Sequence, residues 1–249
     1  MAAALVVLAV LAGWEALVRG GVVDALLLPA PTDVVQALWT DRSLLAEDLA
    51  VTAGEVVLGL TAAVAVGVAL GVSMHLSVPV RKALRPLVIG SQAVPIPVIA
   101  PLFILVLGFG LAPKVLMVAL VCFFPVTINL YDGLRDVDPD ARKLLRSLDA
   151  SRWQRLRLLE APSALPTTFT GIKIAAAVAV IGAVFAEWAG SDRGLGHTLL
   201  IANGQLESAR AFAATFLLFA LAIALYGLFA LLERRVVDWT PRTAPEGGP

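Results

Sequence analysis

Charge is scarce in this sequence. Only 15% of its 249 residues are Asp, Glu, Lys or Arg, and the formal net charge is zero. A neutral chain offers neither a basic surface for nucleic acid nor a polybasic membrane anchor. Cys122 is the single cysteine, which excludes a disulfide framework within the chain, and His75 and His197 have no Cys or acidic cluster near them in the sequence. We therefore expect no nucleic-acid partner, no metal site and no cofactor.

Motifs of enzymes are lacking as well. The sequence has no G-x-x-x-x-G-K-[ST] segment, so it cannot bind ATP through a loop of that kind. No nucleophile and base occur in a recognisable local motif, so a membrane hydrolase would have no visible machinery. Apart from the short tail 243–249, the sequence contains no low-complexity segment and no soluble segment of domain size. We expect no enzymatic activity from this chain.

Apolar residues, in contrast, make up 59% of the chain, and the mean hydropathy is +0.88. Soluble domains contain about 45–50% apolar residues. A helix needs about 20 apolar residues to cross a bilayer. Six runs are long enough, and they lie at about 2–18, 53–75, 86–108, 114–132, 168–188 and 211–232. The sequence therefore predicts an all-α, polytopic membrane protein with six transmembrane helices.

The first run is short and has the length of a signal peptide. It lacks a preceding basic segment, however, and it continues into Trp14-Glu15 instead of a cleavage site of small residues. We expect this run to remain as an uncleaved span.

Lysine and arginine are distributed unequally between the segments that join the runs. With an inside N-terminus, the inner segments hold thirteen of these residues and the outer segments hold five. The inner set is Arg81, Lys82, Arg85, the seven basic residues from Arg135 to Arg157, Arg234, Arg235 and Arg242, and the outer set is Arg19, Arg42, Lys114, Arg193 and Arg210. Because cytoplasmic loops carry the excess of positive residues, we expect both termini and the central loop in the cytoplasm.

The central loop, residues 138–166, is dense in charge between two apolar runs. Its pattern predicts two short helices joined by a tight turn. In the first helix Leu144, Leu145 and Leu148 share one face, and we expect this face to fix the helix by packing. Ser151 opens the second helix with Gln154 three residues later, which is the spacing of a capping box. The turn falls at Asp149, a residue type that tolerates the left-handed conformation.

This loop resembles the cytoplasmic coupling loop, or EAA loop, of ABC importer permeases, whose pattern is close to E-A-A-x-x-L-G-A-S-x-x-Q followed by L-P. The matching residues are Arg146-Ser147-Leu148, Ala150-Ser151, Trp153-Gln154 and Leu165-Pro166. Two positions depart from the pattern: Lys143-Leu144-Leu145 replaces E-A-A, and Asp149 replaces Gly.

The resemblance implies a type I ABC importer transmembrane domain in a bacterial inner membrane. It divides the chain into a first helix with an external segment (1–46), the transmembrane domain (47–235, with the coupling loop at 133–167) and a cytoplasmic tail (236–249). It further implies a separate ABC ATPase subunit, an extracytoplasmic substrate-binding protein, a permease homodimer and a lipid bilayer as partners. The residues expected to couple the chain to the ATPase are Arg146, Leu148, Asp149, Ala150, Ser151 and Gln154.

Two other segments carry a weaker resemblance. Residues 28–34, Leu-Pro-Ala-Pro-Thr-Asp-Val, are similar to the L-P-x-P-x-x-V segment of permeases for nitrate, sulfonate, taurine and pyrimidine precursors. Here Thr32 or Asp33 is expected to cap the next helix. Residues 186–196, which contain A-E-W-A-G and G-L-G, resemble the pyrimidine and sulfonate permeases. This similarity favours a thiamine-precursor pyrimidine or a related aromatic heterocycle as the substrate.

Prolines mark the third run as a candidate lining of the transport pathway. Pro95 and Pro97 follow Gln92, and carbonyls freed by proline survive at membrane depth only inside protein or beside a cavity. A kinked helix that lines the pathway and a purely structural kink are both consistent with this pattern. Glu187, after the fifth run, either contacts the substrate or the binding protein, or lies in water beside the interfacial Trp188; we favour the second alternative.

Small residues recur at four-residue spacing in the second run, at Ala63, Gly67 and Gly71. Such a spacing lets two helices approach closely. We expect packing within the subunit, with a dimer face as the alternative.

A secondary transporter and a membrane enzyme are the rival interpretations. A secondary transporter would need inverted repeats and charged relays inside the membrane. We find no repeat, and Lys173 is the only charged residue that we place away from the ends of the predicted spans.

Overall fold

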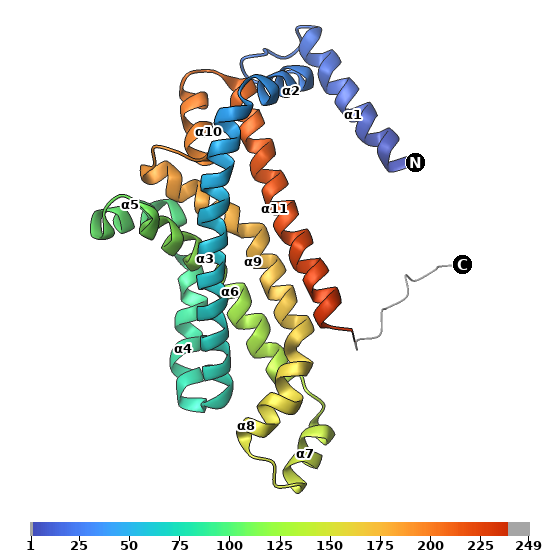
Figure 1. The fold of residues 1–249 in the computed structure, drawn as a ribbon, viewed down its shortest axis with the longest axis vertical. Coiled ribbons are helices and arrows are strands. Elements are labelled where there is room, and N and C mark those ends of the chain that lie inside the picture. The colour runs from blue at the N-terminus through green and yellow to red at the C-terminus, as the bar shows by residue number, and fades with distance from the viewer. Residues whose placement is uncertain (1, 239–249) are drawn as a thin grey trace.

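A computed structural model describes residues 2–238 of the chain. Most of the tail predicted at 236–249, including Arg242, lies outside these residues. The described part is built from helices and the segments that connect them, and Figure 1 shows their arrangement. In chain order the elements are α1 (Ala2–Arg19), α2 (Pro31–Thr40), α3 (Arg42–Leu76), α4 (Val78–Gly90), η1 (Ser91–Ala93), α5 (Ile96–Leu107), α6 (Leu111–Arg135), α7 (Pro139–Ser147), α8 (Arg152–Arg155), η2 (Leu156–Glu160), α9 (Ala161–Gly190), α10 (Leu195–Gly204) and α11 (Ser208–Val236).

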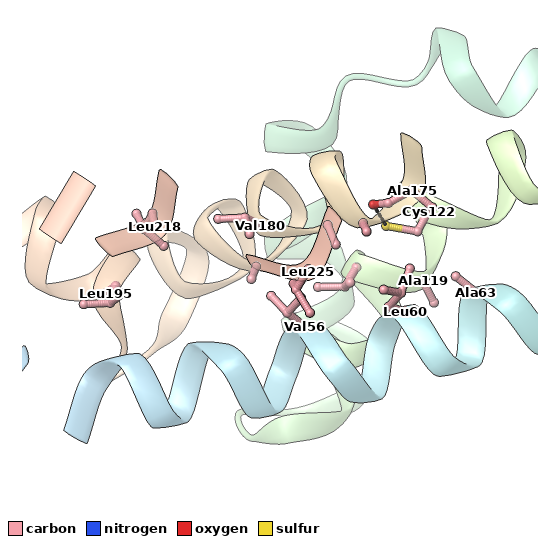
Figure 2. Close-up of a cluster of buried hydrophobic side chains, with 14 of the residues drawn as sticks. Val56, Leu60, Ala63, Ala119, Cys122, Ala175, Val180, Leu195, Leu218 and Leu225 are labelled. Atoms are coloured by element: carbon pink, nitrogen blue, oxygen red, sulfur yellow. Dashed lines mark hydrogen bonds between the residues drawn. The ribbon is translucent and has the colours of Figure 1, made fainter. Parts of the chain in front are cut away.

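Three long helices form the centre of the bundle. Helix α6 packs between α3 and α9, and α11 covers α9 from the other side. Their shared core is made of small and branched side chains, among them Val56 and Leu60 of α3, Cys122 of α6 and Ala175 of α9 (Figure 2). The Cys122 thiol donates a hydrogen bond to the Ala175 carbonyl over 3.3 Å, so this cysteine is fully enclosed.

Glycines set the close approach of α3 to α6. A Cβ atom added to Gly67 would lie 2.8 Å from the Cβ of Val126, and one added to Gly71 would lie 3.1 Å from the Leu130 side chain. Ala63 is completely buried in the same core. The prediction that the small residues pack within the subunit is therefore confirmed.

The third predicted span is not one helix. Helix α4 ends at Gly90, a 3₁₀ turn follows, and α5 leaves at an angle of 103° to α4. Pro95 is the residue before α5, and Pro97 lies in its first turn. Because proline cannot donate to the preceding turn and forces the residue before it into extended backbone, the run 86–108 breaks where we expected only a kink.

Four of the described helical segments are long and apolar enough to span a membrane. They are Arg42–Leu76, Leu111–Arg135, Arg152–Gly190 and Ser208–Val236, and the bent pair α4–α5 makes a fifth if it counts as one span. The run predicted at 2–18 coincides with α1. That α1 also crosses the membrane stays a prediction.

Helix α1 leans away from the bundle and is joined to it through α2 (Figure 1). Arg19 donates to Asp33 over 2.6 Å, and the Thr32 amide donates to Glu15 over 3.1 Å. The expected cap of α2 by Thr32 or Asp33 is wrong: the N-cap is Ala30, which has no side-chain bond, and both polar residues are bound to α1 instead.

Candidate functional site

The charged loop lies at one end of the bundle, and α2 and α10 lie at the other (Figure 1). It folds as predicted into two short helices, α7 and α8, with the π-helical segment η2 leading into α9. Asp149 joins them with a φ of 54°, in the left-handed region. Ser151 and Gln154 form the complete capping box, with bonds of 3.2 Å and 2.7 Å to each other's backbone amides. Local interactions thus define the turn of the hairpin.

A carboxylate at the end of η2 holds the base of the hairpin. Buried Glu160 accepts from Arg142 Nε of α7 over 2.9 Å and lies 2.7 Å from His75 Nε2 of α3. Arg142 also donates to the Leu134 carbonyl over 3.2 Å. The Arg142–Glu160 pair therefore ties the loop to α3 through His75 and to α6 through Leu134. Because these contacts are partly buried, they constrain the loop more strongly than exposed ion pairs would.

Three large apolar side chains of the hairpin are exposed among its charged and polar residues. Leu144, Leu148 and Trp153 are 61%, 68% and 64% exposed. Our expectation that the leucine face fixes α7 by packing within the chain is therefore wrong, because only Leu145 is partly covered. The Glu160 contacts fix the loop instead. Large exposed apolar side chains outside the membrane spans are typical of a surface that a partner covers.

The structure brings the predicted coupling residues together on this hairpin. The side chains of Ser151 and Gln154 form the capping box, and Asp149 forms the turn. The Ala150 carbonyl accepts from Arg155 over 2.6 Å, which closes the turn from inside. Arg146 and Leu148 are exposed, so these two remain available for contact with a partner. The coupling role of all six stays a prediction.

The candidate pathway residues fall into two separate places. Gln92, Pro95 and Pro97 lie at the break between α4 and α5 and are exposed in the single chain. The Gln92 amide donates only to the neighbouring Ser91 hydroxyl, over 3.3 Å. The partners of Glu187 come from α3 and α10 instead.

Glu187 is only 1% exposed, so the expectation that it lies in water is wrong. Its carboxylate accepts from Thr52 Oγ1 over 2.7 Å and from the Gly196 and His197 amides over 2.6 Å and 3.0 Å. These amides belong to the first turn of α10, so one carboxylate satisfies backbone donors that the helix itself cannot. Its place in the pathway stays a prediction.

Two more acidic side chains of α3 extend this network. Asp48 accepts from the Gly194 amide over 3.0 Å and from the Thr198 hydroxyl. Glu55 binds Lys114 of α6 over 2.7 Å, and Lys114 donates to Ser191 over 2.6 Å. We refer to Asp48, Thr52, Glu55, Lys114, Glu187 and their backbone partners as the outer network, after the side of the membrane on which the lysine and arginine distribution predicts them. It locks the segment after α9 against α3.

The outer network corrects one sequence expectation. Lys173 is not the only charge inside the predicted spans, because Glu55 and Lys114 are buried within the second and fourth of them. Lys173 itself is paired with Glu233 of α11 over 2.6 Å. The sequence did contain one signal for this network. Glu55 is a carboxylate within an apolar run, and charged groups at such positions are rare and almost always paired. Within residues 2–238, no three His, Cys, Asp or Glu side chains gather into a metal-binding group.

Comparison with known proteins agrees with this geometry. The model of the family described as "Binding-protein-dependent transport system inner membrane component" matches residues 59–238. A probable ABC transporter permease protein of Haemophilus influenzae is 35% identical over 86% of this chain and 87% of its own length. The formylaminopyrimidine transport permease protein ThiX of Halalkalibacterium halodurans is 33% identical, with 86% of each chain covered. The putative aliphatic sulfonates transport permease protein SsuC of Bacillus subtilis is 31% identical over 96% of this chain and 86% of its own length.

A solved structure shows the same fold. A chain of the MetNI methionine ABC transporter in an inward-facing conformation superposes with a TM-score of 0.70 at 16% identity, covering 78% of this chain and 97% of that one. The chain belongs to the family of inner membrane components of binding-protein-dependent transport systems, and it is an ABC importer permease with the type I transmembrane fold. It is a multi-pass, non-enzymatic membrane subunit of importers for small solutes.

Proposed function

We propose that this chain is the pathway-forming subunit of an ATP-driven importer and that the α7–α8 hairpin docks into a separate ATPase subunit. The observation that carries this proposal is the exposed apolar surface of Leu144, Leu148 and Trp153 on a hairpin whose base is pinned by Glu160. A hairpin that is held at its base and exposed at its far end can act as a lever on the helices to which it is attached. Closure of an ATPase pair would then pull the hairpin and move α3 and α9, to which the base is attached.

Substitution of the uncovered leucines tests the docking. Leu144→Ser and Leu148→Ser should change the stability of the chain by no more than about 0.5 kcal/mol, because both side chains are exposed. They should abolish co-purification of ATPase activity with the tagged chain from its host membranes. Leu27→Ser is the matched control, since Leu27 is 76% exposed on the segment before α2, at the opposite end of the bundle. Undiminished ATPase co-purification in both hairpin variants would reject the docking surface.

We infer that two copies of the chain form the pathway and that the break between α4 and α5 faces it. Exposed Gln92, Pro95 and Pro97 support this assignment, because a broken backbone at membrane depth is tolerated only where protein or a cavity surrounds it. Helix α5 is also strongly apolar and uncovered in the single chain, at Leu105 and Val106. Disulfide cross-linking between copies of a Leu105→Cys variant tests the pairing.

The substrate that we propose is a pyrimidine precursor of thiamine or a related aromatic heterocycle, delivered by an extracytoplasmic binding protein. The A-E-W-A-G and G-L-G segments support it, as does the name of the Halalkalibacterium halodurans relative. Sulfonates, taurine and nitrate are the competing chemistries. Uptake of labelled formylaminopyrimidine by cells that express the complete transporter tests this choice. Absence of formylaminopyrimidine uptake, with uptake of labelled taurine or nitrate by the same cells, would reject it.

A further inference from the structure

A small polar cavity lies at the base of the coupling hairpin. Its volume is 190 Å³, and it is lined by His75 at the end of α3, Arg142 and Arg146 of α7, Arg152 and Arg155 of α8, and Glu160 of η2. The lining of the cavity therefore contains four guanidinium groups and one carboxylate. Because arginine stays protonated at every physiological pH, the lining carries an excess of three positive charges when His75 is neutral.

The protein contacts leave this charge only partly compensated. Arg142 is bound to Glu160 and to the Leu134 carbonyl, and Arg155 is bound to the Ala150 carbonyl. Among the interactions between described residues, the side chains of Arg146 and Arg152 have no hydrogen bond or ion pair. These two residues come from the two arms of the hairpin, so the Asp149 turn brings them to one cavity.

We propose that this cavity binds a phosphate group. A guanidinium group presents a planar fork of donors that matches the oxygens of phosphate, and paired forks are the usual means of holding it. His75 Nε2 is already engaged by Glu160 over 2.7 Å, so the arginine side chains supply the donors for the phosphate. Glu160 would repel an anion that approached it closely, so we expect the phosphate to bind to Arg146 and Arg152, the two lining arginines without a bond to another described residue.

A bound phosphate would join the two arms of the hairpin. It would contact α7 through Arg146 and α8 through Arg152, and thereby add to the clasp that Arg142 and Glu160 make at the base. A hairpin held at both places transmits movement with less internal bending. The phosphate group belongs either to a free anion in the cytoplasm or to an anionic lipid at the membrane surface. The assignment of the cavity to the cytoplasmic side rests on the proposed function, which places the hairpin beside the ATPase.

Titration of the full chain tests the site without an ATPase present, so its failure is distinct from failure of the docking proposal. The first arm titrates inorganic phosphate into the chain in uncharged detergent. The second compares the thermal stability of the chain in nanodiscs of phosphatidylglycerol and of phosphatidylcholine. The test variant is R146Q/R152Q. The control is R234Q/R235Q, which removes the same charge from two exposed arginines in the last turn of α11.

We expect R146Q/R152Q to weaken binding in one of these arms by about tenfold or more, since each lost hydrogen bond is charge-assisted. The control should change it by less than about twofold, because long-range charge is screened. Loss in the phosphate arm identifies a free anion, and loss confined to the nanodisc arm identifies a lipid headgroup. Absence of binding in both arms, or equal loss in the control, would overturn the site. So would loss of ATPase co-purification in R146Q/R152Q without any phosphate or lipid effect, because the cavity would then hold an acidic side chain of the ATPase.

Discussion

Glu160 and Arg142 join the two sides of the coupling loop through a 2.9 Å contact between Oε1 and Nε. They are 18 residues apart in the sequence, because Glu160 lies at the end of η2 and Arg142 lies in the first half of α7. His75 reaches the second carboxylate oxygen from α3. The loop is thus attached to the membrane domain by a charged joint, and Leu144, Leu148 and Trp153 are left exposed for a partner. Force applied to the hairpin can reach α3 through this joint, in addition to the backbone path through η2 into α9.

Glu160→Gln should loosen the loop without unfolding the membrane domain. The amide keeps the size of the side chain but removes the charge that binds Arg142 and His75, and loss of such a partly buried bond costs about 1–3 kcal/mol locally. Amides of α7 should exchange faster with deuterium, and uptake should fall at normal membrane levels. Lys143→Gln is the control, because its ion pair with Asp140 is exposed and contributes about 0.5 kcal/mol or less. Unchanged exchange in Glu160→Gln would contradict the joint.

Thr52→Val should destabilise the outer network. Valine has nearly the shape of threonine, but it can neither donate to Glu187 nor accept from the Leu195 amide, which Thr52 now does over 2.7 Å and 2.9 Å. A buried carboxylate and a buried amide each lose a partner, at a cost of about 1–3 kcal/mol apiece. Thermal unfolding in detergent measures the loss. Thr61→Val is the control, because exposed Thr61 donates only to Val57 of its own helix; equal shifts in both variants would contradict the assigned role.

The sequence was sufficient for the hairpin because its signals are local. The Ser151 cap and the Asp149 turn depend on residues within three positions of each other, so composition and spacing predict them. The outer network could not be predicted in this way. Thr52 and Glu187 are 135 residues apart, and Asp48 and Thr198 are 150 apart. Their pairing depends on how α3, α9 and α10 pack.

The third span shows the same limit. Pro95 and Pro97 predict a kink, but the residue types alone do not give the size of the bend, which is 103°. The prediction for the hairpin leucines was wrong for a different reason. A three-leucine face predicts burial against a neighbour, but periodicity cannot tell whether that neighbour lies in the same chain.

Gly59→Ala should weaken the contact between α3 and α6. The added Cβ would lie 2.4 Å from the Cβ of Val118, so the helices must separate or shift. Overpacking of this kind costs about 1–3 kcal/mol. Gly54→Ala on the same helix is the control: its Cβ would meet nothing within 4 Å, and alanine favours the helix by about 1 kcal/mol. We expect a lower melting temperature for Gly59→Ala only, and a loss in both variants would contradict the packing argument.

Labelling of single cysteines tests the orientation that the lysine and arginine distribution predicts. Val22 and Leu148 are both strongly exposed, on the segment before α2 and on the coupling hairpin, at opposite ends of the bundle. In intact cells a membrane-impermeant maleimide should react with Val22→Cys and not with Leu148→Cys. Once the cells are opened, Leu148→Cys should react as well. The native Cys122 is buried and bonded to Ala175, so the unmodified chain supplies a low background. Thirteen basic residues on the inner side against five outside favour this outcome. Labelling of Leu148→Cys from outside would invert the topology and place the hairpin beyond the reach of any cytoplasmic ATPase.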